Sequence, residues 1–224
     1  MAPLQSFDPQ QVLREVSLGF YFSLLTFYAF LVVRFAGTYR SSQGENKVPL
    51  AVAWLFASLL AGRVVLLVFD YYLTQFDPSR YQEHLLAWKI GSAFQNAGIL
   101  VILVILERQL FHGRDKNVFA LGFVAGVVGL LLAPTVVLAE YFQAASLSFT
   151  AFIPIGYIYL FRKSSGVFRL KSACVLVGFI LFASFSLIVG ELGVALLNLP
   201  SRYWLHLASV FGKLVGGGLI AKGY

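Results

Sequence analysis

Seven apolar runs, each close to twenty residues long, constrain this chain more than any other feature of its sequence. They cover residues 16–37, 50–73, 87–106, 118–138, 142–161, 172–197 and 203–224. An α-helix needs roughly 20 residues to cross the hydrocarbon core of a bilayer. The runs are apolar on every face, whereas strands of a membrane barrel alternate over about 10 residues. The sequence therefore predicts an all-α bundle of seven transmembrane helices, forming a single transmembrane domain over residues 1–224.

The composition excludes the soluble classes of protein. Hydrophobic residues make up 59% of the chain and charged residues 12%, whereas soluble domains contain about 25% charged residues. A soluble fold has too little interior to bury so many Phe, Leu and Val side chains, and the same composition excludes disorder. The lipid bilayer is therefore the first expected partner, and we expect a multi-pass protein of the cell membrane.

The basic residues lie at the ends of alternate runs, which predicts an orientation. The first, third and fifth connections, together with Lys222, carry eleven of the 17 Lys and Arg residues, and the N-terminal arm and other connections carry four. Because Lys and Arg collect in cytoplasmic loops, we expect the N-terminus outside and the C-terminus in the cytoplasm. The net charge of +7 follows from this asymmetry and does not indicate a nucleic-acid partner.

Proline and glycine positions give expectations about individual helices. Pro134 and Pro154 lie inside the fourth and fifth runs, where we expect each of them to kink a helix. Small-residue spacings that let helices approach closely occur in the fourth and seventh runs, as Gly122-x-x-x-Gly126 and Gly212-x-x-x-Gly216. We expect these glycines to mark packing inside the bundle rather than a dimer face.

Polar residues within the apolar runs are the candidates for function, because a charge at membrane depth is costly. The ligand-pocket or buried-charge candidates are Arg63, Asp70, Gln95, Asn96, Glu191, His206 and Lys213. In the predicted orientation this set falls in the outer half of the bundle, where two cations can pair with two anions. Three interpretations stay open: ion pairs that lock helices together, a polar cavity for a small ligand or ion, and pairing with a partner subunit.

Lys213 lies near the middle of the last run, where retinal proteins place the lysine of their Schiff base. Glu191 or Asp70 would have to act as its counter-ion. The third run has no carboxylate in its middle, and the sixth has no Trp or Tyr to hold the retinal ring. These absences argue against retinal, and we predict no cofactor.

The sequence also lacks the motifs of enzymes and metal sites. It contains no His-Glu-x-x-His, no Gly-x-Ser-x-Gly and no paired aspartates within one run. The three histidines lie in separate parts of the chain, and the single cysteine excludes an internal disulfide. Glu107-Arg108-Gln109, at the end of the third run, is interpreted as a snorkelling pair at a helix end rather than a receptor switch. We therefore expect a protein that is not an enzyme and holds no metal.

Two stretches of the sequence, WKIG…VILVILERQLF within residues 88–111 and IPIGYIYLFRK at residues 153–163, carry a resemblance to known proteins. They resemble stretches of uncharacterised archaeal seven-helix membrane proteins, some of which are similar to the sensory membrane portions of signalling proteins. The resemblance implies a seven-helix fold and a sensing role, and it transfers no functional residue.

The leading functional expectation is a receptor-like or sensor-like membrane module without catalytic activity, with a polar pocket in the outer half of the bundle. Such a module signals through a separate cytoplasmic or membrane partner. The basic inner connections, with Arg162, Lys163, Arg169 and Lys171, are either a surface for that partner or for anionic lipid, or topology signals alone. The alternatives are a small transporter or ion-coupled carrier that uses Asp70 and Glu191, and a structural subunit of a membrane complex.

Overall fold

The computed structural model describes residues 9–42, 47–111, 117–187 and 202–224, and these residues form helices joined by short connections without any strand. The helices are α1 Pro9–Ser41, α2 Val48–Leu67, the π-helical η1 Val68–Leu73, the 3-10 helix η2 Pro78–Arg80, α3 Leu85–Phe111, α4 Val118–Leu132, α5 Val136–Phe149, α6 Phe152–Lys163, α7 Gly166–Leu187 and α9 Arg202–Gly223. The predicted all-α class is confirmed.

Six helical segments in the described part of the chain are long and apolar enough to cross a membrane. They are Gln11–Ser41, Val48–Leu73, Leu85–Arg108, Val136–Lys163, Gly166–Ser186 and Tyr203–Gly223. The apolar helix Val118–Leu132 is shorter than these. The lengths and composition of these helices are those of a multi-pass membrane protein.

Pro134 ends α4 instead of kinking it, so the expected fourth helix over 118–138 is wrong. α4 ends at Leu132, and Ala133 leaves the helical region with ψ 128°. A proline disfavours the helical conformation of the residue before it and lacks the N–H that a helix requires. The Thr135 side chain accepts a hydrogen bond from the Leu138 N–H and so begins α5 as a new helix.

The helix is interrupted just before Pro154, the second position at which we expect a kink. α5 ends at Phe149 and α6 begins at Phe152, two residues before Pro154. Because Pro154 has no N–H to offer the carbonyl oxygen of Thr150, that oxygen accepts from the Ile153 N–H at 2.9 Å. The two short helices together make one membrane-spanning length, Val136–Lys163.

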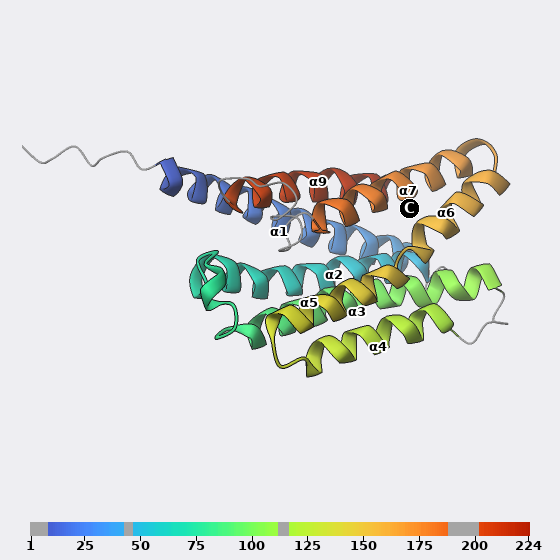
Figure 1. The fold of residues 1–224 in the computed structure, drawn as a ribbon. Helices are drawn as coiled ribbons and strands as arrows, with labels where there is room; N and C mark the ends of the chain where they lie inside the picture. Colours follow the sequence, from blue (N-terminus) through green and yellow to red (C-terminus); the bar gives the residue numbers. More distant parts are fainter. Residues whose placement is uncertain (1–8, 43–46, 112–116, 188–201) are drawn as a thin grey trace, which may run out of the picture.

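The helices lie side by side with their connections alternating between two ends of the bundle (Figure 1). α2 packs between α1 and α3, α9 packs on α1 and α7, α4 pairs with α5, and α6 contacts α3 and α7. The last residues of α1, α3, α6 and α9 share one end, which we call the basic end. Its cationic residues in the described part are Arg40, Lys47, Arg108, Arg162, Lys163, Arg169, Lys171 and Lys222.

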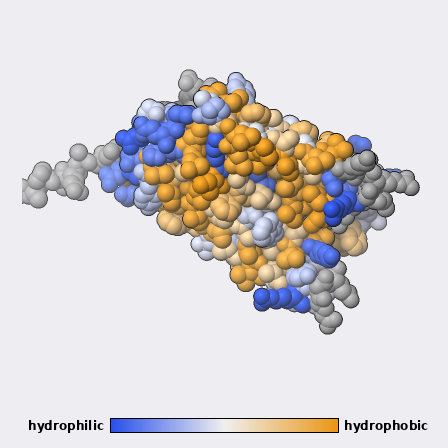
Figure 2. Space-filling model, turned by 90° about the horizontal axis from the view of Figure 1, so that it is seen from below, coloured by the Kyte–Doolittle hydropathy of each residue, from blue (hydrophilic) through white to orange (hydrophobic). Residues whose placement is uncertain are grey.

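The surface of the bundle is apolar around its middle. Figure 2 shows one face, on which a hydrophobic band lies between hydrophilic residues at either end. The exposed apolar side chains come from several helices and include Phe30, Val33, Leu121, Leu132 and Ile155. Soluble monomers rarely expose contiguous apolar patches larger than a few hundred Å², so this band is suited to contact with lipid.

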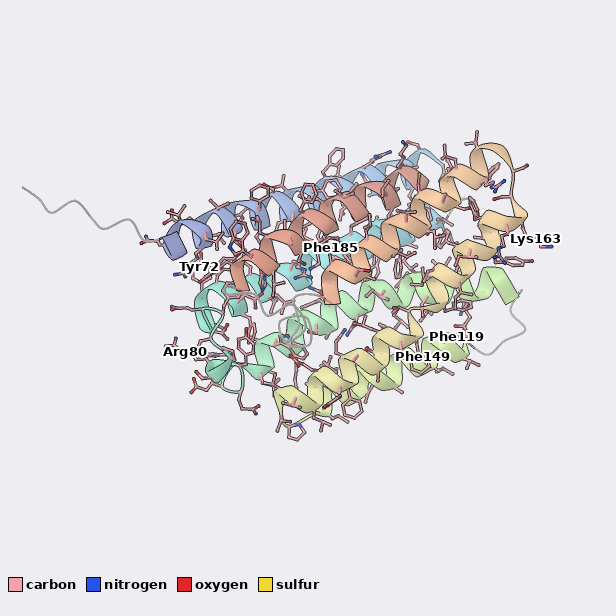
Figure 3. The ribbon with its side chains drawn as sticks, turned by 45° about the horizontal axis from the view of Figure 1, so that its top comes forward. Tyr72, Arg80, Phe119, Phe149, Lys163 and Phe185 are labelled. Carbon is pink, nitrogen blue, oxygen red and sulfur yellow. The ribbon has the colours of Figure 1, made fainter. Side chains whose placement is uncertain are left out.

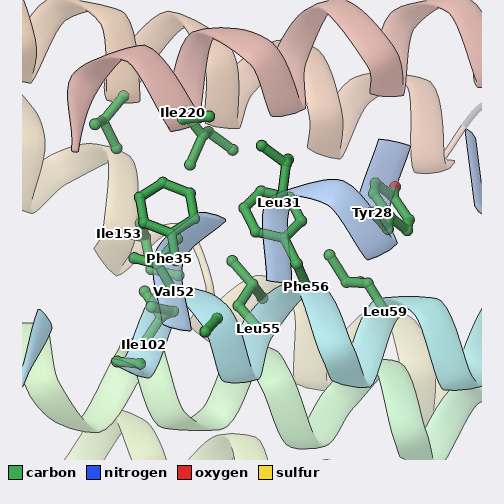
Figure 4. Close-up of a cluster of buried hydrophobic side chains, with 14 of the residues drawn as sticks. Tyr28, Leu31, Phe35, Val52, Leu55, Phe56, Leu59, Ile102, Ile153 and Ile220 are labelled. Atoms are coloured by element: carbon green, nitrogen blue, oxygen red, sulfur yellow. The ribbon is translucent and has the colours of Figure 1, made fainter. Parts of the chain in front are cut away.

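The hydrophobic core lies where α1, α2, α3, α6 and α9 meet (Figure 4). Phe35 of α1 stacks on Phe56 of α2 with ring centroids 6.3 Å apart. Ile102, Ile153 and Ile220 bring α3, α6 and α9 to the same cluster. The core therefore joins elements from both halves of the chain.

Glycines bring α7 and α9 into backbone contact. A Cβ atom on Gly216 would lie 2.7 Å from the carbonyl oxygen of Gly178, and a Cβ atom on Gly178 would lie 2.6 Å from that of Gly216. Gly126 of α4 lies in the same way against the backbone of Ser146 in α5. The expectation that the glycine spacings mark packing inside the bundle is confirmed.

Glu107 connects α3 to the start of α4 and does not snorkel. Its side chain is 1% exposed, and its carboxylate oxygens accept from the N–H groups of Phe119 at 3.1 Å and Ala120 at 3.2 Å. The first N–H groups of a helix have no partner within the helix, and Asn117 at the N-cap makes no side-chain cap bond. The interpretation of Glu107 as a snorkelling residue is wrong, because its carboxylate accepts hydrogen bonds from these buried amides instead of reaching the membrane surface.

Replacing Gly216 by Ala is expected to lower the free energy of unfolding by about 1–3 kcal/mol, because the added methyl group meets backbone atoms that cannot move aside. Gly19→Ala is the matched control, since a Cβ atom there has nothing within 4 Å. Thermal or denaturant unfolding in nanodiscs measures both. Equal stability of the two variants would contradict the close packing of α7 on α9.

Replacing Glu107 by Gln is expected to lower the free energy of unfolding by about 1–2 kcal/mol, because the start of α4 loses a charged acceptor for its N–H groups. Glu83→Gln removes a charge from an exposed carboxylate and is the control. The same unfolding assay applies, and an unchanged midpoint for Glu107→Gln would show that the cap is dispensable.

Candidate functional site

Arg63 of α2 and Lys213 of α9 are both buried inside the bundle. Arg63 is 8% exposed and Lys213 is 1% exposed. Arg63 acts electrostatically on Lys213, so the two cations lie close together although they are far apart in the sequence. A pair of buried like charges is costly, and the surroundings of these two residues decide how it is accommodated.

One face of α1 covers Arg63. Its buried residues recur every three or four positions, as Ser17, Tyr21, Leu24, Tyr28, Leu31 and Phe35. The Tyr21 hydroxyl donates to the carbonyl oxygen of Arg63 at 3.0 Å. Tyr21 and Tyr28, seven residues apart and therefore on the same face, both interact electrostatically with the Arg63 side chain. We call Tyr21, Tyr28, Arg63, Ser209 and Lys213 the polar core.

Lys213 extends the polar core towards α7. Its Nζ atom donates to the Ser209 Oγ at 2.5 Å. The Ser209 hydroxyl donates in turn to the carbonyl oxygen of Phe185 at 2.6 Å. Phe185, labelled in Figure 3, lies against Gly212, where a Cβ atom would be 2.1 Å from its ring. The close approach that Gly212 allows therefore brings the α7 backbone within reach of the serine.

Asp70 lies in the π-helical segment η1 and acts on both cations through space. At the surface, Arg80 forms an ion pair with Asp77 at 3.9 Å. The pairing of Arg63 and Lys213 with Asp70 and Glu191 stays a prediction. Glu191, the other predicted anion, lies outside the described residues.

The remaining predicted site residues fall in different places. Asn96 forms a reciprocal amide pair with Gln143 of α5, with hydrogen bonds of 3.0 and 3.3 Å, so it joins α3 to α5 and is not part of the polar core. Gln95 packs on Gly62, where a Cβ atom would lie 2.5 Å from its Cγ. Gln95 therefore lies next to α2 at Gly62, the residue that precedes Arg63.

His206 belongs to an aromatic cluster at the end opposite the basic end, formed by Tyr71, Phe76, Tyr203 and His206. The Phe76 ring lies edge-on to the other three, at 4.9 Å from Tyr71, 4.8 Å from Tyr203 and 4.5 Å from His206. Phe76 has φ 62°, a conformation that is strained for a bulky side chain. The Tyr71 ring also lies 5.9 Å from Tyr21, so the aromatic cluster adjoins the polar core.

Two donors of the polar core lack a hydrogen-bond partner. They are the Arg63 Nε and the Tyr28 hydroxyl, both buried, and neither has a partner among the residues that the structure describes. Buried polar groups in native proteins are nearly always hydrogen-bonded, and an exception points to an occupant such as a ligand, an ion or a water molecule. The polar core therefore keeps unused hydrogen-bonding groups inside the bundle.

A small apolar cavity lies elsewhere in the bundle. Its volume is about 20 Å³, and Leu55, Ile102, Tyr157, Phe179 and Tyr224 are among its lining residues. A cavity of this size holds about one water molecule, and none of its lining residues belongs to the polar core. It is therefore separate from the candidate site.

Sequence reasoning found the charged members of the site and missed the tyrosines. Tyr21 and Tyr28 carry a weak signal, because they stand seven residues apart in the first apolar run. Their burial depends on which face of α1 turns inward, and a helix that is apolar on all sides does not reveal that face.

The chain matches no protein-family model, no curated protein and no solved structure.

Replacing Lys213 by Met is expected to change the free energy of unfolding by less than about 1 kcal/mol, because Met fills a similar volume and the lysine's partner at hydrogen-bond distance is a neutral hydroxyl. Ser209→Ala is the control, since it removes the same hydrogen bond and keeps the charge. A loss of about 3–5 kcal/mol in Lys213→Met, measured by unfolding in nanodiscs, would instead reveal a buried ion pair.

Proposed function

We propose that this protein is a seven-helix, receptor-like or sensor-like module of the cell membrane that binds a small ligand at its polar core without catalysis. One observation carries the proposal: the Arg63 Nε and the Tyr28 hydroxyl are buried between α1, α2 and α9 without a hydrogen-bond partner among the described residues. A ligand that supplied the missing acceptor would bind three helices at once.

The proposed orientation places the basic end in the cytoplasm and the aromatic cluster towards the outside. The supporting observation is that Lys and Arg gather at one end of the bundle, as cytoplasmic loops require. A ligand from outside then reaches the polar core past Phe76 and Tyr71, whose rings adjoin Tyr21.

A continuous set of contacts supports a sensing role. Ser209 and Lys213 lie in α9, and this helix continues to the basic end, where the Tyr224 hydroxyl is hydrogen-bonded to Tyr157 of α6. α6 ends in Arg162 and Lys163. A shift of α9 on ligand binding would change the basic end, which we propose as the surface for a cytoplasmic partner or for anionic lipid.

A carrier is the second candidate function, and the conformation around Asp70 favours it. Asp70 lies in a π-helical segment, a geometry that is frequent at functional sites, and Gln75 and Phe76 that follow both have positive φ. Strain of this kind is typical of gates and switch regions. The resemblance of residues 88–111 and 153–163 to archaeal seven-helix membrane proteins agrees with the sensor and remains a prediction.

The decisive experiment combines native mass spectrometry with flux measurements on the protein purified in native lipid. We expect wild type to retain one small molecule per chain and Tyr28→Phe to lose it, because the variant lacks the unpartnered hydroxyl. Tyr159→Phe, which changes an exposed tyrosine, should retain it.

Two results would contradict the sensor. Uptake of the identified molecule into liposomes would favour the carrier. A wild-type protein that carries no molecule, and that no compound of a polar-metabolite set stabilises, would remove the binding function altogether.

A further inference from the structure

The polar core is rich in hydrogen-bond donors and poor in acceptors. The Arg63 Nε can only donate, and Lys213 has three N–H donors, of which the Ser209 hydroxyl takes one. The Tyr21 hydroxyl is hydrogen-bonded both to the Arg63 carbonyl oxygen and to the Arg63 side chain, so it is already engaged. An occupant that satisfies this site must accept hydrogen bonds, which excludes a metal cation or an ammonium group.

The charge of the polar core also favours an occupant that is not a cation. When ionised, Arg63 and Lys213 supply two positive charges, and Asp70 supplies one negative charge that acts on both. These three side chains sum to +1 when all are ionised. A net positive charge in an apolar bundle is costly unless a counter-charge lies beside it, so the three described side chains call for one further negative charge.

Aromatic walls limit which anion fits. Tyr28 packs against Phe56 at 5.7 Å and against Phe182 at 6.4 Å. A doubly charged, strongly hydrated anion such as sulfate would exceed the charge available and lose its hydration among these rings. A singly charged, compact anion matches both the charge and the surroundings.

We infer that the polar core binds a small monovalent anion, a halide or a short-chain carboxylate, through Arg63, Lys213 and the Tyr28 hydroxyl. This inference rests on the proposed function and specifies the class of its ligand. Chloride and acetate both carry one negative charge and accept hydrogen bonds, so the same side chains can recognise either ion. Titrating each anion separately shows whether the site binds a halide or a carboxylate.

The test uses the full chain in nanodiscs, equilibrated with gluconate as a bulky anion and titrated with chloride or acetate at constant ionic strength. The readouts are the 35Cl NMR linewidth, which reports bound chloride directly, and the unfolding temperature. We expect saturable binding of one of the two anions, with a rise in unfolding temperature that follows its concentration.

Variants assign the effect to the site. Tyr28→Phe keeps the ring and is expected to weaken anion affinity about tenfold, as loss of a hydrogen bond to a charged group does. Arg63→Gln is expected to abolish saturation. Arg34→Gln and Tyr159→Phe are the matched controls, because both change exposed side chains on helices of the same bundle, and both should bind as wild type does. An effect of equal size in the controls would overturn the assignment.

Two further results would overturn the inference. If wild type shows no saturable anion effect and Glu191→Gln gains one, the counter-charge belongs to the chain itself. If wild type binds neither anion and yet retains a neutral molecule in native mass spectrometry, the anion inference fails and the proposed binding function stands. If neither an anion nor any other molecule binds, both proposals fall.

Discussion

The burial of Arg63 and Lys213 in an apolar bundle is the constraint on which the arrangement around α9 depends. Lipid offers no water to solvate either cation, so neighbouring helices must present polar atoms to them. α1 supplies two tyrosines on its inward face, and α7 supplies the Phe185 carbonyl oxygen through Ser209. The glycines of α9 that allow close contact with α7 therefore have a second role, because they bring this oxygen within reach.

Two other buried polar groups of the described chain are satisfied within the bundle, whereas the Gln95 Nε2 and the Asn117 Oδ1 are left without a hydrogen-bond partner there, as the Arg63 Nε and the Tyr28 hydroxyl are. Asn96 and Gln143 satisfy each other across α3 and α5. Glu107 meets the free N–H groups of α4. In both arrangements the buried side chain has hydrogen-bond partners within the bundle. In the polar core, by contrast, Arg63 and Tyr28 retain donors towards the interior of the bundle.

The two internal prolines illustrate how far local sequence reasoning reaches. Both interrupt hydrogen bonding within an apolar run, and this was predictable because proline has no N–H. At Pro154 the interruption lies within one membrane-spanning length, which α5 and α6 share. At Pro134 the chain reverses instead, since Ala133 is extended and Thr135 begins a new helix. Proline marks the break, whereas the direction after it depends on the capping residue and on the helices available for packing.

The sequence by itself determined the helical class, the membrane environment, the gathering of basic residues at one end and the identity of the buried cations. These follow from run length, composition and charge placement, which need no knowledge of neighbours. Only the tertiary structure decided that Asn96 faces Gln143, that Glu107 caps α4, and that Tyr21 and Tyr28 cover Arg63. The physical reason is that helices apolar on every side carry no pattern that sets their rotation, so the partner of each polar side chain depends on how the helices pack.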